Sequence, residues 1–456
     1  MRKNSKIHPS PLHILSPGQM MVAGFVFLIL LGAVFLTSPL SSANGTSTSF
    51  IDALFTATSA VCVTGLVVVD TSIHWSIFGK VVIILLIQVG GLGFMTLGTL
   101  VALIFGKKIN LRQRILIKEA LNQDDLSGSV KLIKKVLKYT LLIEGLGALL
   151  LSFAFIPQFG FLKGIGYSIF TSISSFCNAG FDLMGSISGE YSSIVSYYNR
   201  PLIVFTISAL IILGGIGFPV IINIVNKRHL KKLSLNSKMA LVTTAILIVG
   251  GFLMIFLGEV GHALHGMTLW EKFQVAFFQS VTTRTAGYAT IDLTQFREST
   301  LFVMIILMFI GASPASTGGG IKTTTAAVLF IAVKSFIKNE NEITVQHKRI
   351  NVFTFRKALG IFIIAISIAV LGVYLLSITQ DPKHFDILSC SFEVSSALAT
   401  VGLSLAGSYH LNGVGKVIIM VLMFAGRVGS LTIFTAFISE NKRKRVRYPE
   451  AKVLVG

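Results

Sequence analysis

Eight long apolar runs dominate this sequence. Each approaches or exceeds the ~20 residues that a helix needs to cross the hydrocarbon core of a membrane. Hydrophobic residues make up 53% of the 456 and charged residues only 13%, which is more apolar surface than a soluble domain can bury. We therefore predict an all-α integral membrane protein that crosses the lipid bilayer several times. The runs lie at about residues 20–38, 79–105, 138–156, 200–226, 239–259, 300–337, 356–378 and 415–438.

The positive charge of the chain follows this predicted topology. The formal net charge is +20, and most of the 39 Lys and Arg residues lie in or beside two tails and three linkers that separate pairs of runs. The other loops carry little charge, so the positive-inside rule predicts that both termini and all three linkers are cytoplasmic. Anionic lipid headgroups are the default partner of such residues, and we expect no nucleic acid partner.

Motifs for catalysis or for a resident metal are weak. Glu259, His262 and His265 form ExxHxxH, but they fall in a predicted outer loop without a further ligand, so we expect no transition metal there. The three cysteines form no CxxC pair and are too few for a disulfide framework. No nucleophile, base and orienting group occur in a recognisable arrangement, so we expect neither an enzyme nor an organic cofactor.

A fourfold internal repeat organises the chain. Between paired runs lie shorter apolar pieces of about 10 to 14 residues, the length expected for segments that enter the membrane and return. Each piece ends in a glycine that is preceded at a fixed distance by Phe and followed by a large apolar or aromatic residue. The glycines are Gly65, Gly180, Gly287 and Gly402, and the preceding residues are Phe55, Phe170, Phe277 and Phe392.

The runs after these pieces repeat as well. Gly90, Gly214, Gly311 and Gly426 come into register, with extra residues only in the outer loop of the second copy. Each unit is therefore a span, a short helix, a glycine strand and a second span. The predicted pore repeats are 20–105, 138–226, 239–337 and 356–438, the cytoplasmic linkers are 106–137, 227–238 and 338–355, and the tails are 1–19 and 439–456.

Four such units around one axis would suit a cation. Backbone carbonyls from four short strands can replace the hydration shell of a monovalent ion. Glycine supplies the backbone conformations that such strands need, and the partially negative ends of the short helices would face the membrane centre. The predicted pseudo-four-fold pore would hold its ion on carbonyls of Val63, Thr64, Gly65, Asn178, Ala179, Gly180, Thr285, Ala286, Gly287, Thr400, Val401 and Gly402.

The sixth run is too long for one crossing, and it is interrupted by glycines, a proline, serines and threonines. We expect two half-helices joined by a polar loop that faces a cavity within the protein, with an ordinary proline kink as the alternative. The loop comprises Gly311, Ala312, Ser313, Pro314, Ala315, Ser316, Thr317, Gly318, Gly319 and Gly320.

Several charged residues lie close to these elements. An intramembrane arginine is by default a functional hypothesis. Arg427 would hold the 311–320 loop shut through its carbonyls, act as an electrostatic barrier beneath the filter, or merely tie two helices together. Lys322 belongs to the same group or extends to the cytoplasm. We expect Arg284 to bind carbonyls at the end of a short helix. Near the starts of short helices, Asp52, Glu271 and Asp386 are expected to act as caps.

These residues resemble the potassium-translocating subunit of the Trk/Ktr/HKT superfamily, and specifically the Ktr type (KtrB-like), because eight spans are present without an additional N-terminal pair. The resemblance runs from Met20 to the C-terminal "YPE" and rests on the four glycine strands and on "GASPASTGGGIKTTT". It implies inward K+ transport across the bacterial cell membrane and a 311–320 loop that acts as a movable gate. It also implies a homodimer on a cytosolic ring of nucleotide-binding RCK subunits (KtrA-like). Sodium dependence and Na+ transport stay open.

A carrier coupled to protons or sodium is the main alternative to a pore. It would need intramembrane carboxylates, and Glu144 and Glu393 are the candidates.

Overall fold

The computed structural model of the chain describes residues 17–93, 129–227, 229–340 and 342–429. Predictions about the first 16 residues, about most of the 106–137 linker and about the 439–456 tail fall outside these ranges.

Almost all of the described secondary structure is helical, which confirms the predicted all-α fold. A two-stranded antiparallel hairpin, β1 (Thr344–Val345) and β2 (Lys348–Arg349), lies in the 338–355 linker. The helices of four or more residues are α1 (Pro17–Thr37), α2 (Phe50–Cys62), α3 (Ile77–Leu92), α6 (Ser129–Phe159), α7 (Phe161–Phe176), α8 (Gly185–Ser188), α9 (Pro201–Gly215), α10 (Phe218–Lys227), α11 (Leu235–Glu259), α12 (Leu269–Thr282), α13 (Glu298–Phe309), α14 (Thr323–Ile337), α15 (Val352–Thr379), α16 (Ile387–Ala399) and α17 (Gly413–Val428).

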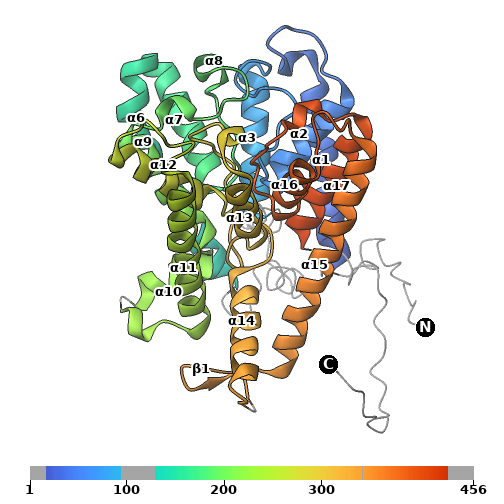
Figure 1. Cartoon of the computed structure of the whole chain (residues 1–456). Coiled ribbons are helices and arrows are strands. Elements are labelled where there is room, and N and C mark those ends of the chain that lie inside the picture. The colour runs from blue at the N-terminus through green and yellow to red at the C-terminus, as the bar shows by residue number, and fades with distance from the viewer. Residues whose placement is uncertain (1–16, 94–128, 228, 341, 430–456) are drawn as a thin grey trace, which may run out of the picture.

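The first span of each repeat is one long apolar helix. Within the described residues, α1, α6, α11 and α15 each contain a segment long and apolar enough to cross a membrane. The second spans of the first and fourth repeats are described only in part, because α3 and α17, with 16 residues each, end beside the limits of the described ranges; the other two second spans are broken. In Figure 1 the short helices α2, α7, α12 and α16 lie in the upper half of the molecule, which we call the outer end, and α10, α14 and β1 lie at the lower end, which we call the inner end.

One predicted span is wrong in shape. The sequence at 200–226 was expected to form a single crossing, but α9 and α10 meet at an angle of 95°. Gly217 adopts a φ of +92° at the bend, and the Phe218 amide donates to the Ala315 carbonyl at 2.9 Å instead of continuing the helix. The 311–320 loop therefore supplies the acceptor that stabilises the break.

The four short helices begin where their side chains provide caps. Ser49, Thr268 and Asp386 each accept a backbone amide in the first turn of α2, α12 and α16, while Gly160 before α7 provides no side-chain cap. Glu271 completes a capping box with Thr268, and Asp52 accepts the Ser49 hydroxyl. The predicted capping roles of Asp52, Glu271 and Asp386 are thus present.

Contacts between repeats close into a ring. The second span of each repeat packs against the short helix of the next one along the chain: α3 against α7, α9 against α12, and α13 against α16. The fourth contact joins α17 to α2, so that the first and last repeats are neighbours (Figure 1, blue and red). Each short helix is thereby in contact with the second span of the preceding repeat around the ring.

Candidate ion-conduction site

Each short helix ends in a strand with the same unusual backbone. The first residue of every strand has a positive φ: 57° at Val63, 58° at Asn178, 63° at Thr285 and 52° at Thr400. The glycine two residues later is also left-handed, with φ of 94° at Gly65, 69° at Gly180, 81° at Gly287 and 98° at Gly402. Non-glycine residues adopt this region at a cost, so four repetitions of the pattern indicate a backbone shaped for a function.

The four glycines face one another in sequence around a closed path. A Cβ atom added to Gly65 would lie 2.5 Å from the Ala179 carbonyl oxygen. The corresponding atom on Gly180 would lie 2.6 Å from the carbonyl of Ala286, and that on Gly287 would lie 2.5 Å from the carbonyl of Val401. On Gly402 it would collide with the Thr64 carbonyl, which returns the path to the first strand. The strands are therefore in backbone contact, and no side chain fits at these positions.

Hydroxyl groups of the short helices form hydrogen bonds with the backbone of the strands that follow them. The Gly65 amide donates to Ser59 Oγ and the Gly402 amide donates to Ser396 Oγ, each at 3.0 Å. In the second and third strands the hydroxyl donates instead: Ser174 to the Phe181 carbonyl and Thr282 to the Tyr288 carbonyl, both at 2.7 Å. Our reading of the sequence missed these residues, although the serine recurs at one fixed distance before the glycine in three copies.

Polar side chains surround the inner ends of the strands. Asn178 Nδ2 donates to the Arg284 carbonyl at 3.2 Å, which links the second strand to the start of the third. The hydroxyls of Thr64, Thr285 and Thr400 are buried and have no hydrogen-bond partner among the residues that the structure describes. Buried polar groups without partners are rare, and oxygen atoms left free beside a ring of carbonyls suit a dehydrated cation.

The glycines aligned in the second spans, Gly90, Gly214, Gly311 and Gly426, occupy matching places in three repeats, and the third repeat differs. Cβ atoms on Gly90, Gly214 and Gly426 would collide with the carbonyls of Val61, Phe176 and Leu398, at matching places in α2, α7 and α16. Gly311 faces Gly319 and Gly320 instead. In the third repeat, residues of the 311–320 loop occupy the position that a short helix occupies in the other three.

That loop separates α13 from α14, as the sequence predicts for two half-helices. It lies directly beneath the strands, because Gly318 and Gly319 pack against Thr285 and Thr400 so closely that neither has room for a Cβ. Its backbone is also joined to the end of α9: the Ser313 amide donates to the Gly215 carbonyl at 2.9 Å, and that of Thr317 to Gly214 at 3.3 Å.

Two cationic side chains hold three successive carbonyls of the loop. Arg427 Nη1 donates to the Thr317 carbonyl, while Nη2 donates to the carbonyls of Gly90 and, at 3.1 Å, Gly91 in α3. Lys322 Nζ turns back to the Gly318 carbonyl at 2.7 Å and lies 3.4 Å from the Gly319 carbonyl. Arg427 therefore bridges the 311–320 loop to the first repeat, and Lys322 stabilises the loop from within.

Arg284 lies elsewhere than predicted. Its side chain is buried, and Nη2 donates to the Gly311 carbonyl at 3.2 Å, at the start of the 311–320 loop rather than at the end of a short helix. The prediction named the wrong carbonyl because the acceptor belongs to a segment that is distant in the sequence.

The three other carboxylates singled out in the sequence all have partners. Glu259 is fully buried and anchors the start of α13, because it accepts from the Arg297 amide at 3.0 Å and from the Thr300 hydroxyl at 2.5 Å. Of the two histidines in ExxHxxH, His262 lies with its Nδ1 3.3 Å from the Glu259 carboxylate. Glu393 accepts from Ser404 and, at 3.1 Å, from Ser408 after the fourth strand. Glu144 accepts from Gln88 Nε2 at 3.2 Å. Within the described residues, no group of three or more His, Cys, Asp or Glu is placed to hold a metal ion.

A ring of glycine strands, an intramembrane loop beneath it and a bridging arginine define a membrane transporter of ions rather than an enzyme. Residues 18–446 match the TrkH family, described as cation transport protein, and the chain belongs to this family. It is 43% identical to the potassium/sodium uptake protein NtpJ of Enterococcus hirae, over 97% of this chain and 98% of the relative. It is 39% identical to the Ktr system potassium uptake protein B of Bacillus subtilis, over 97% of each.

A solved structure agrees with the fold. The crystal structure of the potassium transporter TrkH from Vibrio parahaemolyticus superposes with a TM-score of 0.73 at 18% sequence identity, covering 96% of this chain and 87% of that one. At this identity the similarity supports the shared architecture alone.

Proposed function

We propose that this chain takes up K+ through a selectivity filter built from its four glycine strands, arranged with pseudo-four-fold symmetry about a central pore. The observation that carries the proposal is the closed path of backbone contacts from Gly65 through Gly180 and Gly287 to Gly402. Carbonyl rings of this kind replace the hydration shell of K+. The names of the relatives, which refer to potassium or to potassium and sodium uptake, favour K+ and keep Na+ as a second transported ion.

We propose further that the 311–320 loop is the gate of this pore. It blocks the inner side of the filter, and its closed position depends on donors from outside the loop, above all Arg427. A loop held by a few hydrogen bonds rather than by an apolar core can be displaced at a modest cost in free energy. Regulation then acts by shifting the population of loop positions.

The proposed assembly is a homodimer in the bacterial cell membrane with both termini cytoplasmic. Relatives named as parts of a Ktr system indicate that such chains work in complexes of several components. A cytosolic nucleotide-binding RCK ring is the proposed partner, and the basic linkers at the inner end are its proposed contact surface.

Growth of a K+-transport-deficient bacterium at low K+ tests the proposal. The wild-type chain, expressed with a partner ring, should restore growth and K+ uptake. Gly402→Ser should reduce the preference for K+ over Na+, because the added side chain collides with the first strand. Deletion of residues 311–320 should give uptake without regulation. Failure of the wild type to restore growth would contradict the assignment, and unchanged flux in the deletion variant would contradict the gate.

A further inference from the structure

The outer loop of the second repeat, residues 185–199, contains the extra residues that distinguish this repeat from the others. It begins with α8 and reaches the outer segments of all three other repeats. Two of its residues, Tyr191 and Ser193, have left-handed backbones, with φ of 59° and 51°. Such strained backbone persists only where surrounding contacts determine it. We call residues 185–199 the strap.

Asp70 fixes the strap to the first repeat. The Tyr191 amide donates to Asp70 Oδ2 at 2.9 Å, and Asp70 Oδ1 accepts two local amides, from Ser72 at 2.8 Å and from Ile73 at 3.0 Å. Asp70 is buried, and Gly185 packs against its carboxylate so closely that no Cβ would fit. A second contact runs beside it, between the hydroxyls of Ser72 and Ser186 at 3.0 Å.

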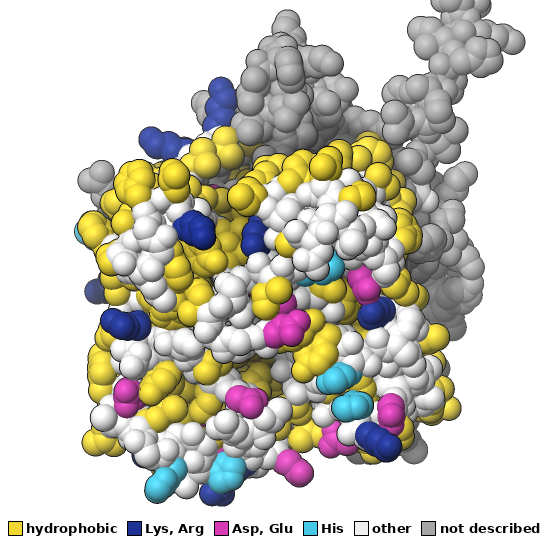
Figure 2. All heavy atoms as spheres, turned by 90° about the horizontal axis from the view of Figure 1, so that it is seen from above, with side chains coloured by type: hydrophobic (Ala, Val, Ile, Leu, Met, Phe, Trp, Pro, Cys, Tyr) yellow, Lys and Arg dark blue, Asp and Glu magenta, His cyan; other side chains and the backbone are white. Residues whose placement is uncertain are grey.

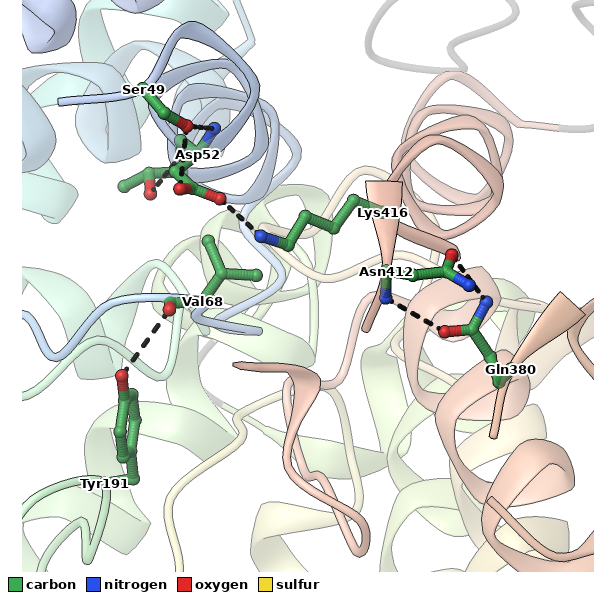
Figure 3. A network of polar contacts seen from close by, with 8 residues as sticks. Ser49, Asp52, Val68, Tyr191, Gln380, Asn412 and Lys416 are labelled. Atoms are coloured by element: carbon green, nitrogen blue, oxygen red, sulfur yellow. Dashed lines mark hydrogen bonds and ion pairs between the residues drawn. The ribbon is translucent and has the colours of Figure 1, made fainter. Parts of the chain in front are cut away.

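The remaining contacts reach the third and fourth repeats. The Ala289 amide, just after the third strand, donates to Ser193 Oγ at 3.1 Å. The ring of Tyr191 stacks on that of Tyr409, with centroids 4.3 Å apart and planes 22° from parallel. Figure 3 shows the Tyr191 hydroxyl directed at the Val68 carbonyl, 3.5 Å away, near the Asp52–Lys416 ion pair.

Tyr191 contributes its hydroxyl to this arrangement as a hydrogen-bond donor. Burial, followed by the nearby carboxylates of Glu190 and Asp70, raises the pKa of Tyr191 to about 12, so its hydroxyl stays protonated. Figure 2 views the outer face that carries the strap, where acidic, histidine and basic side chains lie among apolar ones.

We infer that the strap ties the outer ends of the four filter strands together and thereby sets how strongly the filter prefers K+ over Na+, with Asp70 as the positioning residue. The inference rests on the proposed filter. Carbonyl ligands discriminate between ions of different size only if they are held in place, and a smaller ion is accommodated once they can move inward. The partners of the strap in the other repeats all follow a filter glycine in the chain: Val68, Asp70 and Ser72 follow Gly65, Ala289 follows Gly287, and Tyr409 follows Gly402.

The sequence offers a matched control for Asp70. Asp292 follows its filter glycine at the same distance as Asp70, but its Oδ1 accepts only local groups, the amide of Thr294 at 3.0 Å and its hydroxyl at 2.8 Å. Asp70→Asn retains an oxygen for Ser72 and Ile73 and places an amide donor against the Tyr191 amide. Asp292→Asn makes the same chemical change in the third repeat without affecting the strap.

Rubidium uptake by the full-length protein in liposomes, with and without competing Na+, measures the ion preference. Asp70→Asn should lower the preference for K+ over Na+, and about tenfold is the loss expected if the free energy of one charge-assisted hydrogen bond is expressed fully in the ion preference. Gly185→Ala should give a similar loss, because its Cβ displaces the strap from Asp70, while Gly166→Ala, at a position with open space, should not. The double variant Asp70→Asn/Gly185→Ala should be no worse than the more affected single variant.

The results distinguish failure of the strap's proposed role from failure of the proposed K+ uptake. If the wild type transports K+ with selectivity and both Asp70→Asn and Gly185→Ala retain it, the role of the strap is refuted. An equal loss in Asp292→Asn also refutes it, because the effect would then be general to outer-loop carboxylates. If the wild type transports no K+, the proposed function fails before the strap is considered. Thermal stability in detergent, measured in parallel, shows whether a variant loses selectivity while remaining folded.

Discussion

Replacement of Arg427 by Lys should open the pore. The two ends of the guanidinium group act at once on different elements, with Nη1 on the Thr317 carbonyl of the 311–320 loop and Nη2 on carbonyls of α3. An ammonium group keeps the charge but lacks the planar fork that spans both acceptors. The closed position then loses one charge-assisted hydrogen bond, about 1.5–3 kcal/mol, which shifts the loop equilibrium toward the open position roughly 10- to 100-fold.

K+ flux from proteoliposomes in the absence of any partner ring provides the assay. The Arg427→Lys and Arg427→Gln variants should both leak K+ faster than the wild type. Arg200→Lys makes the same substitution at the exposed start of α9 and should leave the flux unchanged. The competing explanation treats Arg427 as an electrostatic barrier only, in which case Arg427→Lys behaves like the wild type and only Arg427→Gln leaks. That pattern would refute the holding role.

Three further perturbations address the filter and the ring of repeats. Gly65→Ala should abolish K+ uptake, since its Cβ would lie 2.5 Å from the Ala179 carbonyl, whereas Gly250→Ala in α11, with open space around it, should retain uptake; equal activities would argue against backbone contact between the strands. Ser396→Ala should weaken K+ preference without preventing expression, because it removes the acceptor of the Gly402 amide, a hydrogen bond worth about 1 kcal/mol. Competition between Rb+ and Na+ measures this preference, and Ser391→Ala on the exposed side of α16 is the control. Lys416→Met should lower the thermal midpoint in detergent, because the ion pair of Lys416 with Asp52, 2.6 Å long and largely shielded from solvent, joins the first and fourth repeats. Independent effects of Lys416→Met and Asp52→Asn in a double-mutant cycle would contradict this.

The repeat could be recognised from the sequence because its defining residues occur at fixed spacings along the chain. One short helix sets the distance between each Phe and the glycine that follows it, so the same spacing recurs in all four copies. Alignment of the copies therefore brings these residues into register. The same holds for the break between α13 and α14, since Pro314 and three consecutive glycines cannot continue an apolar helix.

Features that depend on another segment were missed or misplaced. The Phe218 amide beyond the bend at Gly217 donates to the Ala315 carbonyl, an acceptor that lies far away in the sequence. The break itself has a local signal that the sequence interpretation missed: Gly93 in "GGLGF" ends α3 with a φ of +79°, just as Gly217 in "GGIGF" follows α9 with a φ of +92°. Arg284 likewise binds a carbonyl 27 residues away in the chain. The contact of Asp70 with Tyr191 crosses from the first repeat to the second, and sequence spacing carries no information about it.

The most direct test of the filter is a crystal structure of the protein grown with Tl+ as a K+ substitute. The anomalous signal should show thallium on the axis enclosed by the strands that contain Gly65, Gly180, Gly287 and Gly402, above the 311–320 loop. Anomalous peaks found only elsewhere, with none between these four strands, would contradict the central claim that one chain supplies the whole ion-binding ring.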